Sequence, residues 1–408
     1  MDKFDVIITG AGLNGLATAL SLGGRRCRTP LKVAVVDRAD PTKFAVAAHD
    51  SRCSAMTAAS INMLKALGAW EAMADHAQTM NSIVVTNARS VESRNTLLGF
   101  PDLGGKSPAV FLENQVIFQG LLGEIVQSPE IHFVTGSATK SFSFGPGLAQ
   151  VALEDGRVLK ANLIVGADGR NSAAREAAHI KMEGWAYNQS AITLTVGHEL
   201  PHGGEAQEHF HDHGVFAILP VSGNRSSIVW TATHDVATAT CALPDDEFLI
   251  ELQKHFGDQL GKLELLSARH VYPLALQLAD SFYGERLALL GDAAHVVHPL
   301  AGLGLNLGFK DAAALSECVM EAAALGADIG GASVLEAYAR WRRFDTISTA
   351  AMMEGLNRLF ANDNEALRLL RQAGLKIVDN MGAVKQAVVK EASGMTGAVP
   401  RLMRGLAA

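Results

Sequence analysis

Cysteine is scarce in this chain: the 408 residues include four, Cys27, Cys53, Cys241 and Cys318. No two of them form a CxxC pair, and their wide scatter fits neither a zinc site nor a disulfide framework. Free thiols, buried or incidental, are the simplest interpretation, and they indicate a reducing compartment. We therefore expect no metal.

Excess positive charge and long apolar runs are also lacking. The formal net charge is -7, so electrostatics gives no support for a nucleic-acid partner. The chain opens with Met1-Asp2-Lys3-Phe4 and shows no signal-peptide pattern, and no apolar stretch reaches transmembrane length. We expect a soluble, cytoplasmic protein, with a peripheral contact to the inner membrane left open.

Glycine, by contrast, is abundant, with 39 residues clustered in a few runs. Gly10, Gly12 and Gly15 form a GxGxxG motif between a strand-like run at 4–9 and a helical stretch at 16–22. In this setting the first glycine permits a tight turn, the second lets the backbone approach a pyrophosphate, and the third lets the helix pack on the strand.

A second buried strand, residues 31–37, completes a βαβ unit and ends at Asp37, 22 residues after Gly15. A carboxylate at this place holds ribose hydroxyls in dinucleotide-binding proteins. The pattern predicts a dinucleotide site, with an incidental glycine turn as the alternative.

Two further aspartates follow buried strands. Asp168 lies in GADGRNS (166–172), and Asp292 lies in GDAAH (291–295). Ligands bind at the carboxyl ends of strands in such sheets, so both side chains are candidates for cofactor contacts. Capping of a helix N-terminus is the alternative for each.

A glycine-rich loop follows Asp292 and runs into a helix around 304–308. Backbone N–H groups at a helix start can face the pyrimidine edge of a flavin, which gains negative charge on reduction.

The remaining pattern predicts an α/β chain with an inserted antiparallel sheet. Strands are expected at 82–86, 131–134, 150–153, 163–165, 191–196, 215–220, 227–232 and 287–290, with a hairpin turn at Asp155-Gly156. Helices are expected at 110–126, 335–375 and 381–389, and residues 97–106 are rich in turn formers.

The three motifs identify a family. GAGLNG at 10–15, GADGRNS and GDAAHVVHPLAGLGLNLGFKD at 291–311 resemble the class A FAD-dependent aromatic hydroxylases. The last string, with YPL at 272–274, is most similar to the ubiquinone-biosynthesis hydroxylases, and the resemblance spans nearly the whole chain.

The resemblance implies a fold like that of para-hydroxybenzoate hydroxylase. A Rossmann-like FAD-binding domain would comprise 1–80, 104–181 and 276–340; an inserted antiparallel-sheet substrate domain would comprise 81–103 and 182–275; a helical region would fill 341–408.

The implied activity is hydroxylation of the ring of a polyprenylated phenol in ubiquinone biosynthesis. O2 would react through a C4a-hydroperoxyflavin, and NAD(P)H or a redox protein would donate the electrons. A homo-oligomer or a ubiquinone-biosynthesis complex is a further expected partner. Two alternatives stay open: another FAD oxidoreductase, such as a dehydrogenase or reductase, and an FAD- and lipid-holding subunit of a complex.

The resemblance also implies roles for individual residues, each at the position that matches the family's motif. The family implies pyrophosphate contacts from Gly10, Gly12, Leu13 and Asn14; ribose contacts from Asp37 with Arg38 beside it; and cofactor contacts from Arg52, Gln115, the Ala138 backbone, Asp168 and Asp292. Near the flavin ring it implies Pro299 and the backbone of Gly304, Leu305 and Asn306. Leu303 departs from the family, which usually has Gln there.

The histidines carry weaker signals. His209, His211 and His213 share one strand face, which favours a polar face over a metal site. We expect His295 to shape the flavin loop by hydrogen bonds. His298, beside Pro299, is the candidate for contact with flavin or substrate.

The C-terminal region is weakly basic. Lys385, Lys390, Arg401 and Arg404 outnumber Asp379 and Glu391 there, which favours a solvated amphipathic helix over a membrane-binding surface.

Overall fold

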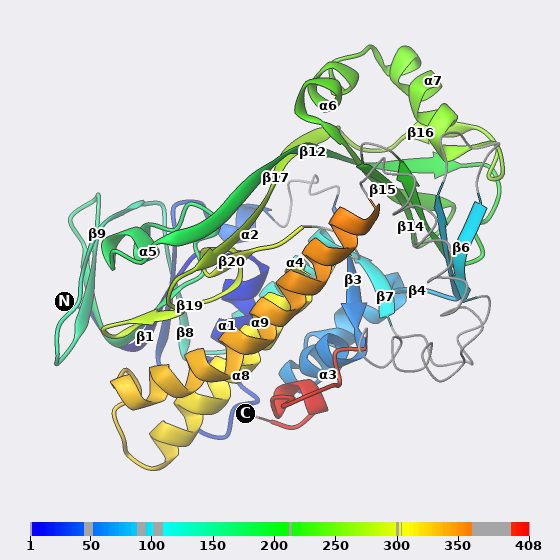
Figure 1. Ribbon diagram of the computed structural model, residues 1–408. Coiled ribbons are helices and arrows are strands. Elements are labelled where there is room, and N and C mark those ends of the chain that lie inside the picture. The colour runs from blue at the N-terminus through cyan, green and yellow to red at the C-terminus, as the bar shows by residue number, and fades with distance from the viewer. Residues whose placement is uncertain are drawn as a thin grey trace.

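Two large sheets lie side by side in the computed structural model, and long strands join them (Figure 1). The structure describes residues 2–44, 52–87, 95–100, 109–211, 214–298, 302, 304–360 and 393–407. Among the described helices, none combines the length and the apolar character that crossing a bilayer requires.

The first sheet is mostly parallel and carries the glycine motif. Its strand order is β18-β19-β11-β1-β2-β8, and a hairpin of β9 and β10 adds to β11. The strands are β1 (Asp2–Thr9), β2 (Val33–Asp37), β8 (Ile131–Thr135), β9 (Thr139–Ser143), β10 (Ala149–Leu153), β11 (Val158–Gly166), β18 (Tyr283–Gly284) and β19 (Leu287–Leu289).

Helices α1 (Leu13–Gly23), α4 (Asn114–Val126) and α8 (Gly304–Ala324) pack around this sheet, and α9 (Ala332–Phe360) lies against α8. The core strands are apolar without alternation, because both faces of a parallel sheet are buried. Short helices α2 (Pro41–Phe44) and α5 (Ala173–Ala177) follow β2 and β11.

The register of this sheet brings the predicted motifs to one edge. Thr9 is the partner of Val36 and of Gly166, Gly166 is the partner of Leu289, and Asp37 is the partner of Thr135. All four pairings are parallel, so the carboxyl ends of β1, β2, β11 and β19 meet where a ligand is expected.

The second sheet is mostly antiparallel, in the order β20-β17-β12-β15-β14-β13-β5-β6, with β16 added to β12. Its strands are β5 (Ser82–Asn87), β6 (Asn95–Phe100), β12 (Met182–His198), β13 (Glu205–His211), β14 (Gly214–Val221), β15 (Arg225–Thr233), β16 (Leu263–Leu265), β17 (His270–Ala279) and β20 (His295–Val296). Strands β12 and β17 are long and reach the first sheet (Figure 1).

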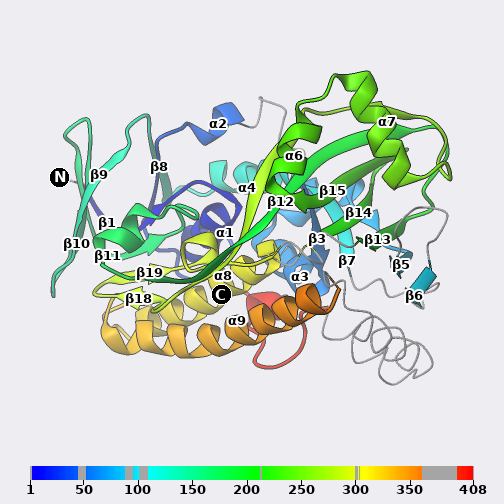
Figure 2. The same ribbon diagram turned by 45° about the horizontal axis from the view of Figure 1, so that its top comes forward.

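Helices α6 (His234–Cys241) and α7 (Asp245–Phe256) cover one face of the second sheet, as Figure 2 shows. A third, small sheet of β3 (Cys53–Thr57), β7 (Ala109–Glu113) and β4 (Gln78–Thr79) lies on the other side, next to α3 (Ala58–Leu67). The second sheet therefore has an outer face under α6 and α7, and an inner face toward the rest of the molecule.

Most predicted elements are confirmed, and two are wrong. The helix expected from 110 begins only at Asn114, because residues 109–113 form β7 and pair with β3. A short apolar run does not by itself distinguish a strand from a helix. Residues 95–100, expected in part as turn, form β6 against β5. The hairpin turn at Asp155-Gly156 is confirmed, with Gly156 at a φ of 90°.

The domain limits stay a prediction. Strand β17 continues across the expected boundary at 275/276, and α9 continues across the one at 340/341. The helix expected at 335–375 is confirmed as far as Phe360; its remainder, 361–375, and the helix expected at 381–389 lie outside the described residues.

Candidate active site

The glycine turn has the geometry that its three glycines predict. Gly10 has a φ of 102°, and a Cβ there would lie 2.3 Å from the Ala167 carbonyl oxygen. A Cβ on Gly15 would lie 2.0 Å from the Gly10 carbonyl oxygen. At Gly12 an added Cβ meets nothing within 4 Å. The first and third glycines are thus required by packing, while the second leaves open space at the start of α1.

Asp37 fixes this turn. Its Oδ2 accepts a hydrogen bond from the Ala11 N–H at 2.8 Å, and its Oδ1 accepts one from the Ala39 N–H at 2.9 Å. Arg38, beside it, is exposed. Ala138 follows the neighbouring strand β8, and its carbonyl accepts from the Glu154 N–H at 3.0 Å. These residues lie at the end of the sheet expected to hold the adenosine.

Asp168 accepts a hydrogen bond from the first turn of α5, whose N-cap is Ser172, and has a second carboxylate oxygen without a described donor. Its Oδ2 accepts a hydrogen bond from the Ala174 N–H at 3.1 Å in α5. Its Oδ1 is buried without a hydrogen-bond partner among the described residues. Burial raises the pKa of this carboxyl, against the hydrogen bonds that lower it. Asp168 therefore supports the start of α5 beside the N-cap Ser172, and one of its oxygens is left for a ligand.

Asn14 links the glycine turn to the late motif. A Cβ on Gly291 would lie 2.4 Å from Asn14 Nδ2, and a Cβ on Gly308 would lie at the same distance from it. Both glycines are needed so that the amide can lie between η4 (Gly291–Ala293) and α8. Asn14 Oδ1 is buried, and no described residue donates to it. Unpaired buried acceptors are costly, so Asn14 and Asp168 suit a ligand with hydroxyl donors, such as the ribityl chain of FAD.

Asp292 is exposed on the short helix η4, and the residues before and after it are fixed by hydrogen bonds. Asp311 Oδ2 accepts from the Gly291 N–H at 3.1 Å and lies 2.5 Å from His295 Nε2. Arg175 Nη1 donates to the Ala293 carbonyl at 3.0 Å. The prediction that His295 shapes this loop by hydrogen bonding is confirmed.

A buried charge network lies behind this segment. Arg342 of α9 and Asp311 are both 0% exposed, and Arg342 Nε donates to Asp311 Oδ1 at 2.8 Å. Asp345 binds Arg342 and also Lys310, whose Nζ lies 2.7 Å away. Burial raises the pKa of Asp311, but the charges of His295 and Arg342 outweigh it and hold the pKa below its ordinary value.

This network could hardly be predicted from local patterns, because Arg342 and Asp345 belong to no motif. Their i, i+3 spacing on a helix is the only local signal.

The start of α8 is anchored by the Asn306 side chain. Asn306 Oδ1 accepts from the Thr57 N–H at 3.0 Å and from Ser60 Oγ at 2.8 Å, and Nδ2 donates to the Ala55 carbonyl at 2.7 Å. Gly304 and Leu305 precede Asn306 in the first helical turn, where N–H groups have no intrahelical acceptor. Pro299 and Leu303 lie outside the described residues.

Arg52 and Gln115 lie where the small sheet meets the second sheet. The Arg52 guanidinium carbon is 5.4 Å from the centre of the Tyr272 ring in β17, and the Arg52 carbonyl accepts from the Asn114 N–H at 3.0 Å. Gln115 follows as the second residue of α4 and is half-buried.

His298 is buried beside the flavin loop. Its ring packs edge-on against Tyr187, with centroids 5.3 Å apart, and the Tyr187 hydroxyl donates to Glu354 of α9. Burial lowers the pKa of His298 to about 4, although Glu354 opposes this. His298 is therefore a neutral ring at neutral pH, and its contact with flavin or substrate stays a prediction.

The other histidines form no metal centre in the described part of the chain. His209 is buried and lies 2.7 Å from Thr86 Oγ1 through Nδ1 and 3.0 Å from Gln207 Oε1 through Nε2. The His211 ring packs on His255 of α7, and His213 lies outside the described residues.

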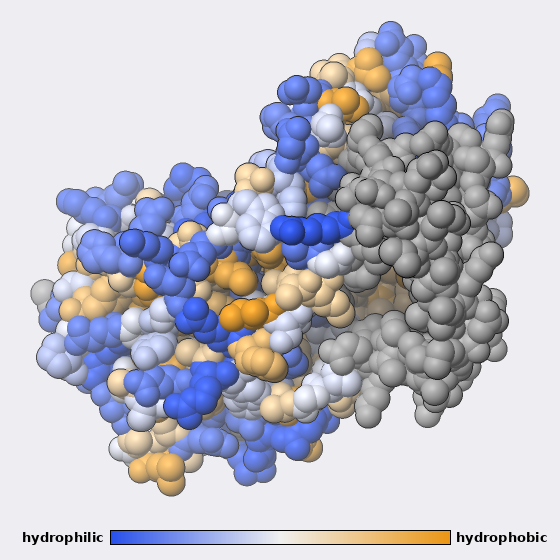
Figure 3. Space-filling view, viewed as in Figure 1, coloured by the Kyte–Doolittle hydropathy of each residue, from blue (hydrophilic) through white to orange (hydrophobic). Residues whose placement is uncertain are grey.

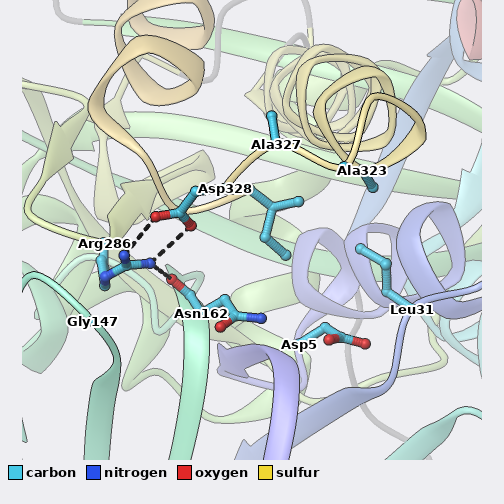
Figure 4. A pocket seen from close by; sticks show the side chains of 10 residues that line it. Asp5, Leu31, Gly147, Asn162, Arg286, Ala323, Ala327 and Asp328 are labelled. Carbon is cyan, nitrogen blue, oxygen red and sulfur yellow. Dashed lines mark hydrogen bonds and ion pairs between the residues drawn. The ribbon is translucent and has the colours of Figure 1, made fainter.

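A separate pocket lies at the opposite end of the parallel sheet, where the strands begin, near Asp5 and Leu31 (Figure 4). Arg286 lines it, donating to the Asn162 carbonyl at 2.8 Å and forming an ion pair with Asp328 at 2.6 Å. Leu31 precedes β2, so this pocket faces the amino ends of the strands and not the edge that carries the glycine turn.

Comparison with known proteins agrees with this geometry. A family model described as an FAD binding domain matches residues 3–346. Ubiquinone hydroxylase UbiL of Rhodospirillum rubrum is 38% identical, over 98% of this chain and 93% of its own length. The 3-demethoxyubiquinol 3-hydroxylase of Escherichia coli is 30% identical, over 96% and 98%.

A solved structure shows the same fold. The p-nitrophenol 4-monooxygenase PnpA of Pseudomonas putida superimposes with a TM-score of 0.80, at 17% identity, over 97% of this chain and 99% of its own. The para-hydroxybenzoate hydroxylase-like fold expected from the sequence is confirmed. This chain uses FAD and belongs to the family of FAD-dependent monooxygenases that includes the ubiquinone hydroxylases.

Proposed function

We propose that this protein hydroxylates the aromatic ring of a polyprenylated phenol in ubiquinone biosynthesis, with O2 as co-substrate. The similarity to the ubiquinone hydroxylase of Rhodospirillum rubrum carries this proposal, because 38% identity extends over 98% of the chain and includes both sheets. The substrate class comes from that relative's name, and the site described above offers free acceptors at Asn14 and Asp168 and an open Gly12 that suit the same cofactor.

The FAD pyrophosphate would lie over the open space at Gly12, between the backbone of Gly10 and that of Leu13 and Asn14. The N-terminus of α1 supplies N–H groups and the positive end of the helix dipole there. Asp37 would hold the adenosine ribose, with Arg38 and Ala138 at the same end.

The middle of the cofactor would meet polar groups from three elements. Asn14 Oδ1 and Asp168 Oδ1 are acceptors without a described donor, and Asp292 is exposed at the same edge of the sheet. Gln115 and Arg52 approach from α4 and the end preceding β3. Ribityl hydroxyls would donate to these oxygens.

The flavin ring would face the first turn of α8. Backbone N–H groups of Gly304, Leu305 and Asn306 would bind its pyrimidine edge, and the helix dipole would favour the negative charge gained on reduction. Pro299 and His298 would border the ring. Bound and reduced FAD supplies the activation of O2; the chain orients the phenol and excludes water.

The electron donor would be NAD(P)H or a redox protein, and the lipid substrate implies a reversible contact with the inner membrane. An apolar patch crosses the middle of the face in Figure 3, where Figure 1 places α9. Phe344, Ile347 and Met352 are exposed on that helix. This patch suits a lipid surface or another subunit of a biosynthetic complex.

A test in cells identifies the substrate. The gene would be expressed in bacteria that lack a ubiquinone hydroxylase and accumulate a prenylated phenol, and the quinone pool would be measured by mass spectrometry. We expect the accumulated phenol to gain one oxygen and ubiquinone to return. No change in that pool, with FAD-loaded protein present and with hosts blocked at each ring position, would contradict the proposal.

A further inference from the structure

The second sheet has two chemically different faces. Ile192, Phe216 and Trp230 point outward and form an apolar cluster with Phe248 and Phe256 of α7. Side chains alternate along a strand, so the residues directly before and after these three point to the inner face. His209 is the cross-strand partner of Phe216 and lies on the outer face, which places its neighbour Glu208 on the inner face.

The inner face adjoins the loop that leads into α8. Ala206 of β13 belongs to the same face as Glu208 and packs with Phe111 of β7, in a cluster that includes Ala55 and Leu219. A Cβ on Gly302 would lie 3.5 Å from the Ala55 Cβ, and Asn306 donates to the Ala55 carbonyl. Glu208 is two residues along the strand from Ala206, about 7 Å farther on this face.

Within the part of the chain that the structure describes, the sheet neighbours of Glu208 are apolar. Its cross-strand partners are Val85 in β5 and Ala217 in β14. Ala217 is paired in turn with Val229 of β15. Glu208, Ala217 and Val229 all keep some accessible surface, although α6 and α7 cover the opposite face. Burial raises the pKa of the Glu208 carboxyl to about 7.

Among the described residues, no titratable group around Glu208 offers it a cation. Arg225 of β15 is paired with Glu113 of β7 at 3.0 Å. Burial raises the pKa of the Cys53 thiol in β3, which keeps it neutral. His270 and Tyr272 lie on β17, across β14, β15 and β12 from β13. Ile83, Val215 and Leu219, on the strands beside β13, do not titrate.

We propose that Glu208 binds the phenol hydroxyl of the substrate on the inner face of the sheet and takes up its proton. This inference rests on the proposed function, which places an electron-rich phenol between this face and the start of α8. An isolated carboxyl among apolar side chains gives such a ring one polar contact and thereby fixes its orientation.

The proton transfer balances without any further reactant. The phenol O–H bond breaks, the proton moves to a Glu208 carboxylate oxygen, and the electron pair stays on the phenol oxygen. The ring becomes more electron-rich and is attacked more readily by an electrophilic oxygen atom. A carboxyl that titrates close to the working pH is well suited to this exchange, and it returns the proton to water when product leaves.

The variants Glu208→Gln and Glu208→Asp test this role, with Glu205→Gln as the matched control. Glu205 lies on the same strand, and its carboxylate accepts a hydrogen bond from the Gln207 amide at 3.0 Å. FAD-loaded proteins would be compared for kcat and KM from pH 5.5 to 9. We expect wild-type kcat to rise through about pH 7, and Glu208→Gln to lose that inflection and about 100-fold in kcat. Glu208→Asp should keep the inflection, and Glu205→Gln should match the wild type.

A binding measurement separates this inference from the proposed function. Absorbance changes of bound FAD would report the affinity for a short-tailed phenol and for its methyl ether, which lacks the proton. The wild type should prefer the phenol by at least about 10-fold, as one polar contact to a charged group allows, and Glu208→Gln should lose the preference. Equal affinities in the wild type, or an unchanged preference and pH profile in Glu208→Gln, would overturn the role of Glu208, whether or not the wild type turns over.

Discussion

Asp311 Oδ2 lies 2.5 Å from His295 Nε2, and both side chains are buried behind the segment that carries Asp292. The same oxygen accepts from the Gly291 N–H, and the other carboxylate oxygen accepts from Arg342. One carboxylate thus joins α8, α9 and the flavin-side loop. Removal of this carboxylate should loosen the loop and leave the buried Arg342 guanidinium with Asp345 as its remaining counter-charge.

Asp311→Asn should destabilise the protein by about 1–3 kcal/mol, because Arg342 would keep only the half-buried Asp345 as its counter-charge. FAD occupancy should fall with it. Urea unfolding of the apoprotein at pH 7 measures the effect. Glu251→Gln, which breaks the exposed pair with Lys254, is the control and should change stability by less than about 1 kcal/mol. A loss for Asp311→Asn as small as the control's would refute the bridging role.

The buried network around Asp311 also predicts how the free energy of unfolding changes with pH. The pKa of Asp311 is held below its ordinary value of 3.8 despite burial, because of His295 and Arg342. Its stabilising contribution is therefore fully present above that value and is lost as the pH falls through the lowered pKa. The gap in unfolding free energy between wild type and Asp311→Asn should narrow only below about pH 4.

Gly10 and Gly12 should respond differently to alanine. Gly10→Ala puts a Cβ against the Ala167 carbonyl at a left-handed φ, and should destabilise the apoprotein by about 1–3 kcal/mol. Gly12→Ala has space and should leave apoprotein stability within about 1 kcal/mol. The affinity of Gly12→Ala for FAD should nevertheless fall at least about 10-fold, because the pyrophosphate needs that space. Fluorescence titration with FAD decides this, and wild-type affinity in Gly12→Ala would place the pyrophosphate elsewhere.

His298 should make stability fall in mildly acidic solution. Burial lowers its folded pKa from 6.5 to about 4, so the unfolded chain binds a proton that the folded chain does not between those values. The contribution of neutral His298 to the free energy of unfolding is fully present above about pH 6.5. It falls by on the order of 2–3 kcal/mol as the pH drops toward 4. Urea unfolding at pH 7, 6 and 5 should show a shallower fall for His298→Gln. Parallel falls in the two proteins would mean that His298 titrates normally.

Asn306→Ala should loosen the start of α8. The variant would leave the Thr57 N–H, the Ser60 hydroxyl and the Ala55 carbonyl without this partner. Because buried polar groups left unpaired are destabilising, we expect the free energy of unfolding to fall by about 1–3 kcal/mol in all. Asn224→Ala is the control, since Asn224 is exposed and its side chain donates only to the Glu199 carbonyl among the described contacts. Thermal unfolding and FAD release rates provide the measurement, and equal Tm values for the two variants would contradict the anchoring role.

Local sequence patterns were sufficient for the cofactor edge of the molecule. The glycine spacing at 10–15 and the aspartates that end strands depend on short-range geometry, and the parallel register of β1, β2, β11 and β19 brings them together. The expected role of His295 also follows from its position, two residues after the 3-10 helix that carries Asp292.

The other features could not be predicted, because they depend on contacts between residues far apart in the sequence. The run Val110–Glu113 is a strand because β3 and β4 pair with it. The ion pair between Asp311 and Arg342 joins the last residue of the late motif to a helix that carries no motif. Glu208 is one of many charged residues in the sequence. Its isolation becomes visible only when the register places Val85 and Ala217 on either side.

The most direct test of the account is oxygen transfer by the purified protein. The FAD-loaded enzyme would be reduced without oxygen, mixed with 18O2 and a polyprenylated phenol, and the product analysed by mass spectrometry. We expect one labelled oxygen on the ring, at a position that fragmentation identifies. Flavin that is reoxidised with release of peroxide, and no labelled product from any of several prenylated phenols, would contradict the hydroxylase assignment.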